Sequence, residues 1–201
     1  MASPASASTS AASSTSAAAL GNKSLASVLL ADKGSFDRNG KDFDILRTAV
    51  LAVLKEKPDS AVKVLTDGNT ALTAFLPNDR AFKLLVKDIT KSRKLPSEKA
   101  AARAVTGLGI DTVETVLLYH VVPGATINGK IALKSDDAVL KTAQGGKVKL
   151  NVALHYPNVS FHLVDADKND KNAKVVTVDI NKGNKQIAHS VDRVLRPVDL
   201  P

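Results

Sequence analysis

The sequence contains no cysteine and no tryptophan, and it has only two tyrosines and five phenylalanines among 201 residues. The lack of cysteine excludes disulfides, thiolate metal ligands and thiol catalysis. It leaves the cellular compartment open, since a chain of this length can bury a core without disulfides. Because aromatic residues are scarce, the core must consist mainly of Val, Leu, Ile and Ala, and the 44% hydrophobic content is sufficient for one domain.

Long apolar runs are also missing, so the sequence predicts no integral membrane segment. Residues 1–20 are almost entirely Ala, Ser and Thr and carry no charge. Such a segment buries too little surface to offset its ordering entropy, which predicts a disordered tail over 1–22 and a single domain over 23–201. The tail lacks the basic and Leu-rich regions of a signal peptide. It is therefore interpreted as the start of a secreted protein whose signal peptide has been removed.

The charge is strongly unbalanced, with a formal net charge of +8. One stretch is densely basic and contains Lys83, Lys87, Lys91, Arg93, Lys94, Lys99 and Arg103. Nucleic-acid binding would require aromatic residues for base stacking or a recognisable binding motif, and the stretch has neither. The pattern favours a solvated helix face followed by a basic loop. Attraction to an acidic polysaccharide or an anionic membrane surface remains a second interpretation.

The sequence carries no pattern typical of an enzyme. There is no Gly-x-Ser-x-Gly elbow and no phosphate-binding Gly-rich loop. His189 and Ser190 are adjacent, but neighbouring residues of a strand point to opposite faces and cannot act as base and nucleophile. We therefore predict a protein without catalytic residues.

Metal-binding patterns are incomplete. His155 and His162 lie seven residues apart and lack an obvious third ligand. Residues 165–170 (DADKND) begin like a calcium loop. However, Asp170 stands where such a loop needs Gly, and Val176 stands where it needs Glu. The segment is interpreted as a charged connection between strands, and no metal cofactor is predicted.

Two helices are expected near the start of the domain, over residues 25–31, with Ser24 as N-cap, and over residues 42–57. The second helix has an apolar face roughly 200° wide, whereas an ordinary surface helix has a stripe of roughly 100°. Either this helix is buried between two layers, or one flank of it lines a groove for an apolar ligand.

The remaining pattern predicts first one strand, then three helices, then five strands. The last of these three helices is expected to begin with Asp111 as its cap, and Pro123-Gly124 prevents it from continuing. A Gly145-Gly146 turn predicts a hairpin. The expected ranges are 71–76 for the first strand, 80–86, 98–105 and 111–120 for the helices, and 138–142, 147–153, 159–164, 174–180 and 186–195 for the later strands. Helices followed by short strands indicate an α+β fold, with helices packed on an antiparallel β-sandwich.

Three segments of this layout resemble the conserved parts of a fasciclin (FAS1) domain: residues 70–82 (TALTAFLPNDRAF), 117–124 (LLYHVVPG) and 187–197 (IAHSVDRVLRP). Their order and spacing extend the resemblance over residues 24–200. It implies a fasciclin-like fold and a secreted binding or adhesion module without catalytic activity. It also implies that Tyr119, His120 and His189 are structural, through buried hydrogen bonds.

The chain also resembles the water-soluble astaxanthin-binding fasciclin proteins of green algae. Shared features are the Ser/Ala-rich start, the basic composition and two Asn-x-Ser glycosylation sequons, at Asn22 and Asn158. The resemblance implies a secreted or cell-wall protein that carries astaxanthin or a related xanthophyll and protects against light and oxidation. It would be a monomer, or a dimer with the ligand bound.

An apolar groove for such a pigment would need an aliphatic lining. Our candidates lie on three of the expected helices: Val28, Leu29, Ile45, Ala49, Val53, Leu54, Ile110, Val113, Val116 and Leu117. Plain core packing is the alternative for each of them. The alternative function is an extracellular adhesion or matrix module that binds a protein or an acidic glycan through its basic surface.

Overall fold

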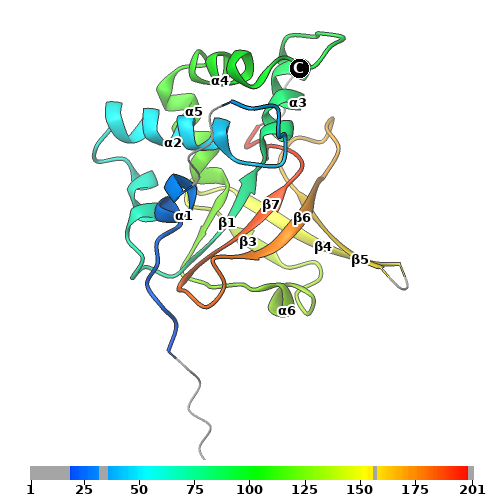
Figure 1. Ribbon diagram of the computed structural model, residues 1–201. Coiled ribbons are helices and arrows are strands. Elements are labelled where there is room, and N and C mark those ends of the chain that lie inside the picture. The colour runs from blue at the N-terminus through cyan, green and yellow to red at the C-terminus, as the bar shows by residue number, and fades with distance from the viewer. Residues whose placement is uncertain (1–18, 32–35, 156–157, 199–201) are drawn as a thin grey trace, which may run out of the picture.

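The computed structural model of the chain describes residues 19–31, 36–155 and 158–198. Helices come first and strands dominate the second half, as expected (Figure 1). The helices are α1 (Leu25–Ala31), α2 (Asp44–Glu56), η1 (Ala61–Thr66), α3 (Asp79–Ile89), α4 (Glu98–Thr106), α5 (Ile110–Tyr119) and α6 (Gly129–Ala132). The strands are β1 (Leu72–Pro77), β2 (Val121–Pro123), β3 (Val139–Lys141), β4 (Lys147–His155), β5 (Asn158–Val164), β6 (Ala173–Ile180) and β7 (Gln186–Val191). The predicted α+β class is confirmed.

Side-chain caps explain where several helices begin. The Ser24 hydroxyl accepts a hydrogen bond from the Ser27 backbone N–H, and the Asn78 and Ser97 side chains cap α3 and α4 in the same way. For α5 the predicted cap was wrong, because Asp111 lies inside its first turn. Gly109 precedes the helix with φ of 93°, a left-handed conformation that suits glycine and lets the chain turn sharply after α4.

The strands form one sheet in the order β2-β1-β7-β6-β5-β4-β3. Every pair is antiparallel, as predicted, except for β1 and β7, the second and third strands of this order, which run parallel. Both of these strands are buried along their whole length. The last strand ends at Val191 rather than at residue 195. Beyond this strand, the Leu195 backbone N–H donates to the His120 side chain and not to a neighbouring strand.

The helices pack against one side of the central strands, and the rest of the sheet curls around a second cluster (Figure 1). The larger cluster joins α1 to α5 with β1 and contains Leu25, Ile45, Val53 and Leu117 among others. The smaller cluster lies within the curled sheet, where Phe75 and Tyr119 are its large side chains. As the composition predicted, most members of both clusters are aliphatic.

The start of the domain is fastened to its last hairpin. The Gly21 backbone N–H donates to Gly183, the Lys185 N–H donates to Gly21, and Gly21 forms a parallel bridge with Asn184. Of the predicted disordered tail, residues 1–18 lie outside the described residues. Residues 19–22, which precede the predicted boundary at residue 23, are described, and the backbone groups of Gly21 pair with the hairpin whatever the side chains are.

Gln186 completes this attachment. Its side chain is fully buried; the Oε1 atom accepts from the Leu25 N–H at 2.8 Å, and the Nε2 atom donates to the carbonyls of Val64 and Asp67 at 2.7 and 2.8 Å. One side-chain amide thereby provides hydrogen-bond partners for a backbone N–H in the first turn of α1 and for two carbonyl groups at the end of η1. The N-terminal helix is thus held in place by a residue of the last strand.

Candidate functional site: an apolar cleft beside α5

The apolar face of α2 is buried by its neighbours. Ile45, Ala49 and Val53 are each no more than 1% exposed, and Leu29 on α1 is 4% exposed. The helix packs against α3, α4, α5 and η1. This explains the unusual width of the face, because α2 is covered on several sides. These four residues are therefore part of the core, where the described residues cover the apolar face of α2.

The other candidates lie nearer the surface or on α5. Leu54 and Ile110 are half-buried and pack against the same core, and Val28 is half-buried on α1. On α5, Val113 and Leu117 are buried and Val116 is half-buried. Of the ten candidates, Val116 is the one in the wall of an apolar cleft on the described part of the chain.

That cleft has a volume of about 480 Å³ and lies between α3, α5 and the segment that follows β7. Eight of its lining residues are apolar: Leu85, Ile89, Leu108, Val116, Val194, Leu195, Pro197 and Val198. Polar groups complete the lining: Lys91, Asp111, Thr112, Thr115 and Arg196. The composition is that of a small-molecule site, which is mostly apolar with a few polar groups.

A narrow internal space of about 20 Å³ adjoins the cleft. The two share Leu85, Leu108, Thr112 and Val116 in their walls. The inner space extends to Ala49 on α2 and is also lined by Val113 and Leu117. Four of the ten candidates therefore border either the cleft or its inner extension.

The third wall of the cleft, residues 194–198, is held by a buried histidine. The His120 side chain is 4% exposed; its Nε2 atom accepts from the Leu195 N–H at 2.8 Å, and its Nδ1 atom lies 2.7 Å from the Val116 carbonyl. Because a backbone N–H can only donate, Nε2 must be unprotonated and Nδ1 must carry the proton. Burial lowers the pKa of His120 to about 4, so the ring is neutral and bridges two walls of the cleft.

Arg196 holds the same segment from the other side. It is 8% exposed and donates to Asp167 at 3.0 Å and to Asp88 at 2.9 Å, with Asp170 at 3.2 Å. Its backbone N–H donates to Asp165, whose pKa is raised to about 6 by burial. The charged connection predicted over residues 165–170 is thus the partner of Arg196.

Tyr119 and His189 join elements across the sheet. The Tyr119 hydroxyl donates to the Lys147 carbonyl at 2.7 Å, which ties α5 to β4. Gly146 makes this possible, since a Cβ atom there would lie 2.8 Å from the Tyr119 ring. The His189 Nε2 atom lies 2.8 Å from the Ile127 carbonyl, which ties β7 to the loop before α6, and burial lowers the pKa of His189.

This geometry can be set beside known proteins. A family model described as the fasciclin domain matches residues 46–197. The chain belongs to the fasciclin family. Among solved structures, the FAS1 domain pair from the insect cell adhesion molecule fasciclin I is similar, at 19% identity and a TM-score of 0.49. That match covers 79% of this chain and 46% of the other chain. A comparison with curated proteins found no match.

Fasciclin domains are commonly extracellular adhesion modules and are generally non-enzymatic. No helix within the described residues has both the length and the apolar character needed to cross a membrane. Of the two sequons in this fasciclin domain, Asn22 is exposed just before α1. Asn158 begins β5, and its side chain lies outside the described part of the structure.

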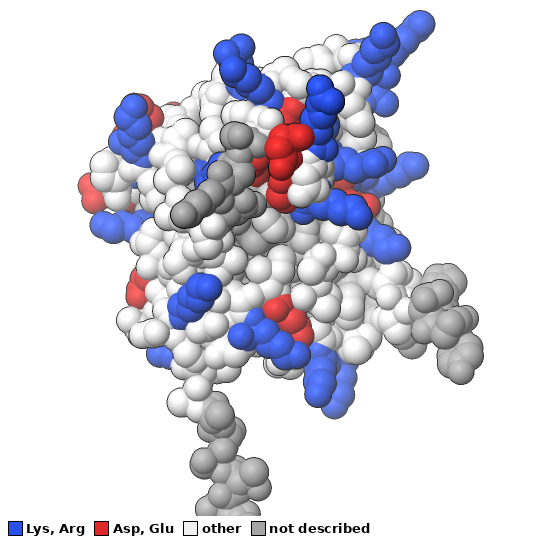
Figure 2. All heavy atoms as spheres, in the orientation of Figure 1, with Lys and Arg blue, Asp and Glu red and all other residues white. Residues whose placement is uncertain are grey.

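The basic stretch of this fasciclin domain covers the end of α3, the following loop and α4. Lys83 and Lys87 are half-buried, and the other five basic side chains of the stretch are exposed. Lys and Arg side chains project over much of the face shown in Figure 2. The expected solvated helix face and basic loop are confirmed.

Most of the residues that line the cleft were not among the candidates predicted from the sequence. Leu85 and Ile89 lie four residues apart on α3, so helical spacing could have placed them on one face. The segment 194–198 follows the last strand without forming a regular element itself, so no periodicity could have marked it.

Proposed function

We propose that this fasciclin domain carries an elongated apolar molecule, a carotenoid such as astaxanthin or a related xanthophyll, in the cleft beside α5. The observation that supports the proposal is the cleft of about 480 Å³ with a mostly aliphatic wall. This volume falls within the range of roughly 300–1,000 Å³ typical of small-molecule sites. Transfer of a polyene from water to such a wall is favourable in proportion to the apolar area that is buried.

The arrangement of polar groups also suits such a ligand. A xanthophyll has a long apolar middle and oxygenated rings at its ends. Lys91, Asp111, Thr115 and Arg196 give the lining hydrogen-bonding groups, while its other parts are aliphatic. A secreted carrier of this kind would keep the pigment dispersed in water and would act in protection against light and oxidation.

The proposal predicts that the cleft, and not apolar surface in general, takes up pigment. Purified protein mixed with astaxanthin should co-elute with visible absorbance on a sizing column. Ile89 and Leu108 are each 40% exposed in the cleft wall, so Ile89→Glu/Leu108→Glu should fold normally. The double variant should bind pigment about tenfold more weakly or worse, because charge then replaces apolar contact.

A matched control uses exposed apolar residues of the sheet. Val139 and Val176 are 59% and 49% exposed and are not part of the cleft. Val139→Glu/Val176→Glu should keep the wild-type pigment uptake. Absence of pigment from the wild-type peak, or equal losses in the two double variants, would count against the proposal.

A second candidate function rests on the basic surface next to the cleft. An open groove of about 570 Å³ is lined by Lys87, Lys91, Lys171 and Arg193 among others. A groove with several cations attracts polyanions and suggests an adhesion module that binds an acidic glycan. Asp88 and Asp170 in the same lining reduce the positive charge.

Heparin chromatography tests the glycan function. Wild-type protein should be retained at low salt and released as the ionic strength rises, because salt screens exposed charges. Lys91→Glu/Lys171→Glu should elute earlier, whereas the control Lys55→Glu/Lys63→Glu should lose less retention, since its exposed lysines lie outside the groove. Equal losses in the two variants would indicate a response to net charge alone.

A further inference from the structure

Exposed apolar side chains lie in the wall of the cleft beside α5. Ile89 is exposed at the end of α3, Leu108 is exposed in the turn between α4 and α5, and Val198 is exposed in the segment after β7. All three line the cleft. Single exposed apolar residues are ordinary on a protein surface. Three of them from separate elements around one cleft indicate a surface that can bind an apolar partner.

Cations adjoin these apolar side chains. The cleft shares Lys91 and Arg196 with the neighbouring open groove, which Lys171 also lines. Arg93 and Lys94 are exposed and follow Lys91 by two and three residues, so their backbones lie within about 11 Å of it. Lys and Arg side chains project from the α3–α4 loop at the top right of Figure 2. The cleft therefore opens beside a positively charged surface.

The carboxylates beside these cations are already paired. Asp88 and Asp170, which line the groove, both form ion pairs with Arg196. Asp111, which lines the cleft, pairs with Lys57. Within the described chain, the two adjacent cations at positions 93 and 94 form no ion pair. Their charge is therefore available to an anionic partner.

A strained backbone holds Lys91 between the cleft and the groove. Thr90 caps the end of α3, and Lys91 follows it with φ of 51°, in the left-handed region. The Ser92 N–H donates to the Lys87 carbonyl at 3.0 Å and closes the helix end. Glycine is the usual residue at such a position, because a Cβ atom is unfavourable there. The helix end thus carries a cation where an uncharged glycine would be less strained.

We propose that this surface docks the protein on an anionic lipid bilayer, with the cleft turned toward the lipid. Acidic headgroups attract the cations, and exposed apolar side chains next to them can enter the interfacial region. Leu95 belongs to this set, because it is exposed and directly follows Lys94. The docking surface consists of Ile89, Leu95, Leu108 and Val198 with Lys91, Arg93, Lys94 and Lys171.

Other partners fit the docking surface less well. An acidic glycan would pair with the cations but would leave the four apolar side chains in water. A second copy of the chain would bring two positively charged surfaces together, and these would repel each other. An anionic bilayer supplies negative charge and an apolar layer at once. Docking is independent of the pigment proposal, since it is a property of the protein without a ligand.

The test is sedimentation of the full chain, without pigment, with vesicles of phosphatidylcholine alone or mixed with phosphatidylglycerol. The protein should sediment with the mixed vesicles only and should be released as the salt concentration rises. Arg93→Gln/Lys94→Gln should weaken binding about 25-fold, since each cation near such a surface contributes about fivefold. The control Lys55→Gln/Lys63→Gln removes the same charge at exposed positions outside the docking surface and should bind nearly as the wild type does.

A second pair of variants separates a bilayer from a glycan. Leu95→Ser/Leu108→Ser keeps the net charge, so its elution from heparin should not change. Its binding to the mixed vesicles should weaken about tenfold or more, because apolar contact is lost. The control Val139→Ser/Val176→Ser, at exposed positions of the sheet, should bind the vesicles as the wild type does.

Three results would overturn the proposal. Equal binding to the two kinds of vesicle, or binding to neither, would exclude recognition of an anionic bilayer, and this comparison needs no variant. Equal losses in the two charge variants would indicate a response to net charge alone. Wild-type vesicle binding by Leu95→Ser/Leu108→Ser would show that the surface recognises polyanions in general, as a glycan-binding module does.

Discussion

Replacement of Arg196 by leucine is expected to lower the free energy of unfolding by about 3–5 kcal/mol, the usual effect of removing one partner from a buried ion pair. Arg196 forms ion pairs with Asp88, Asp167 and Asp170, and Arg193 pairs with Asp170 as well. The Asp167 side chain is fully buried. Without the guanidinium, the buried Asp167 carboxylate loses the ion pair with Arg196 and keeps its hydrogen bonds from the Asn169 and Asp170 N–H groups. Urea denaturation followed by circular dichroism at pH 7 measures the loss.

Arg103→Leu is the matched control, because Arg103 is exposed on α4 and forms no ion pair among the described residues. It should change stability by less than about 0.5 kcal/mol. The double variant Arg196→Leu/Asp167→Leu should recover part of the loss, since both buried charges are then gone. A loss below about 1 kcal/mol in Arg196→Leu would show that water enters the network and compensates for the missing cation.

Replacement of His120 by leucine is expected to have a large effect that depends on pH. At pH 7 the variant leaves the Leu195 N–H and the Val116 carbonyl without their buried partner, at about 1–3 kcal/mol for each group. The folded-state pKa of His120 is about 4 and the unfolded value is 6.5. The stabilisation from neutral His120 is therefore complete above pH 6.5 and is lost as the pH falls from 6.5 to 4.

Over that window the advantage of the wild type over His120→Leu should shrink by roughly 3 kcal/mol. Urea curves of both proteins at pH 7, 5.5 and 4.5 give the difference directly. Thr115→Ala, on the same helix, removes no titrating group and should give a difference that does not change with pH. A pH-independent difference for His120→Leu would mean that the ring can accept a proton without breaking its bond to Leu195.

The pH dependence of the unfolding free energy of the wild type would not reveal the contribution of His120 by itself. The reason is that the ionisation of Asp79 changes the stability in the opposite direction. Burial raises its folded-state pKa from the ordinary value of 3.8 to about 8. Stability from protonated Asp79 is therefore complete below pH 3.8 and is lost as the pH rises through 8. Between pH 4 and 6.5 the two buried groups oppose each other, which is why the difference between variants is the quantity to measure.

Much of the fold could be predicted because its local signals agree. Ser24 predicted the start of α1, Gly145-Gly146 predicted the hairpin of β3 and β4, and the fasciclin-like segments predicted the family. The parallel pairing of β1 with β7 could not be predicted from alternation. A buried strand appears in the sequence as an apolar run, and this run is the same whether the neighbouring strand is parallel or antiparallel.

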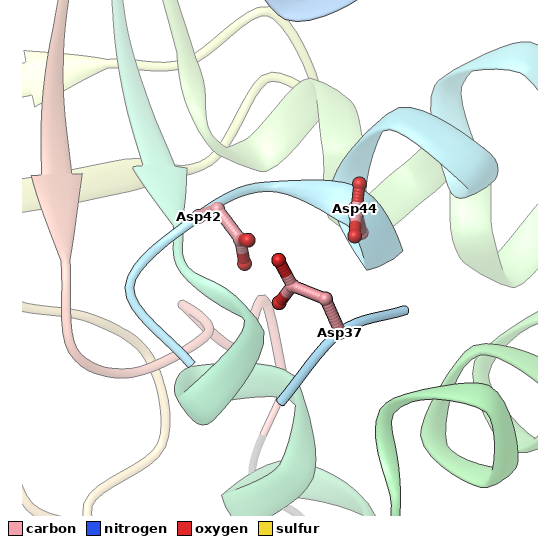
Figure 3. Close-up of side chains that lie close together, drawn as sticks. All are labelled: Asp37, Asp42 and Asp44. Atoms are coloured by element: carbon pink, nitrogen blue, oxygen red, sulfur yellow. The ribbon is translucent and has the colours of Figure 1, made fainter. Parts of the chain in front are cut away.

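The candidate sites were less accessible to sequence reasoning, because each is assembled from distant segments. The width of the apolar face of α2 correctly indicated burial on several sides, but the face itself cannot reveal whether a ligand or α4 covers it. A buried acidic cluster shows the same limit. Asp44, Asp79 and Glu98 look like ordinary first-turn acids in the sequence, but the fold brings their carboxylates together. Figure 3 shows two further carboxylates, those of Asp37 and Asp42, beside Asp44. Their meeting at one point depends on how three helices pack.

The contact between Leu25 and Gln186 joins residues 161 apart in the chain. The ribosome synthesises the chain from the N-terminus, so α1 is made long before Gln186, whose side-chain amide anchors it. The strand β1 can pair with β2 earlier, but its other edge has no partner until β7 has been synthesised. Until then the nascent chain exposes one edge of an apolar strand, a state prone to aggregation. Synthesis of β7 therefore completes the pairing of β1 and the attachment of α1 together, and truncation before residue 186 should leave chains that cannot complete the fold.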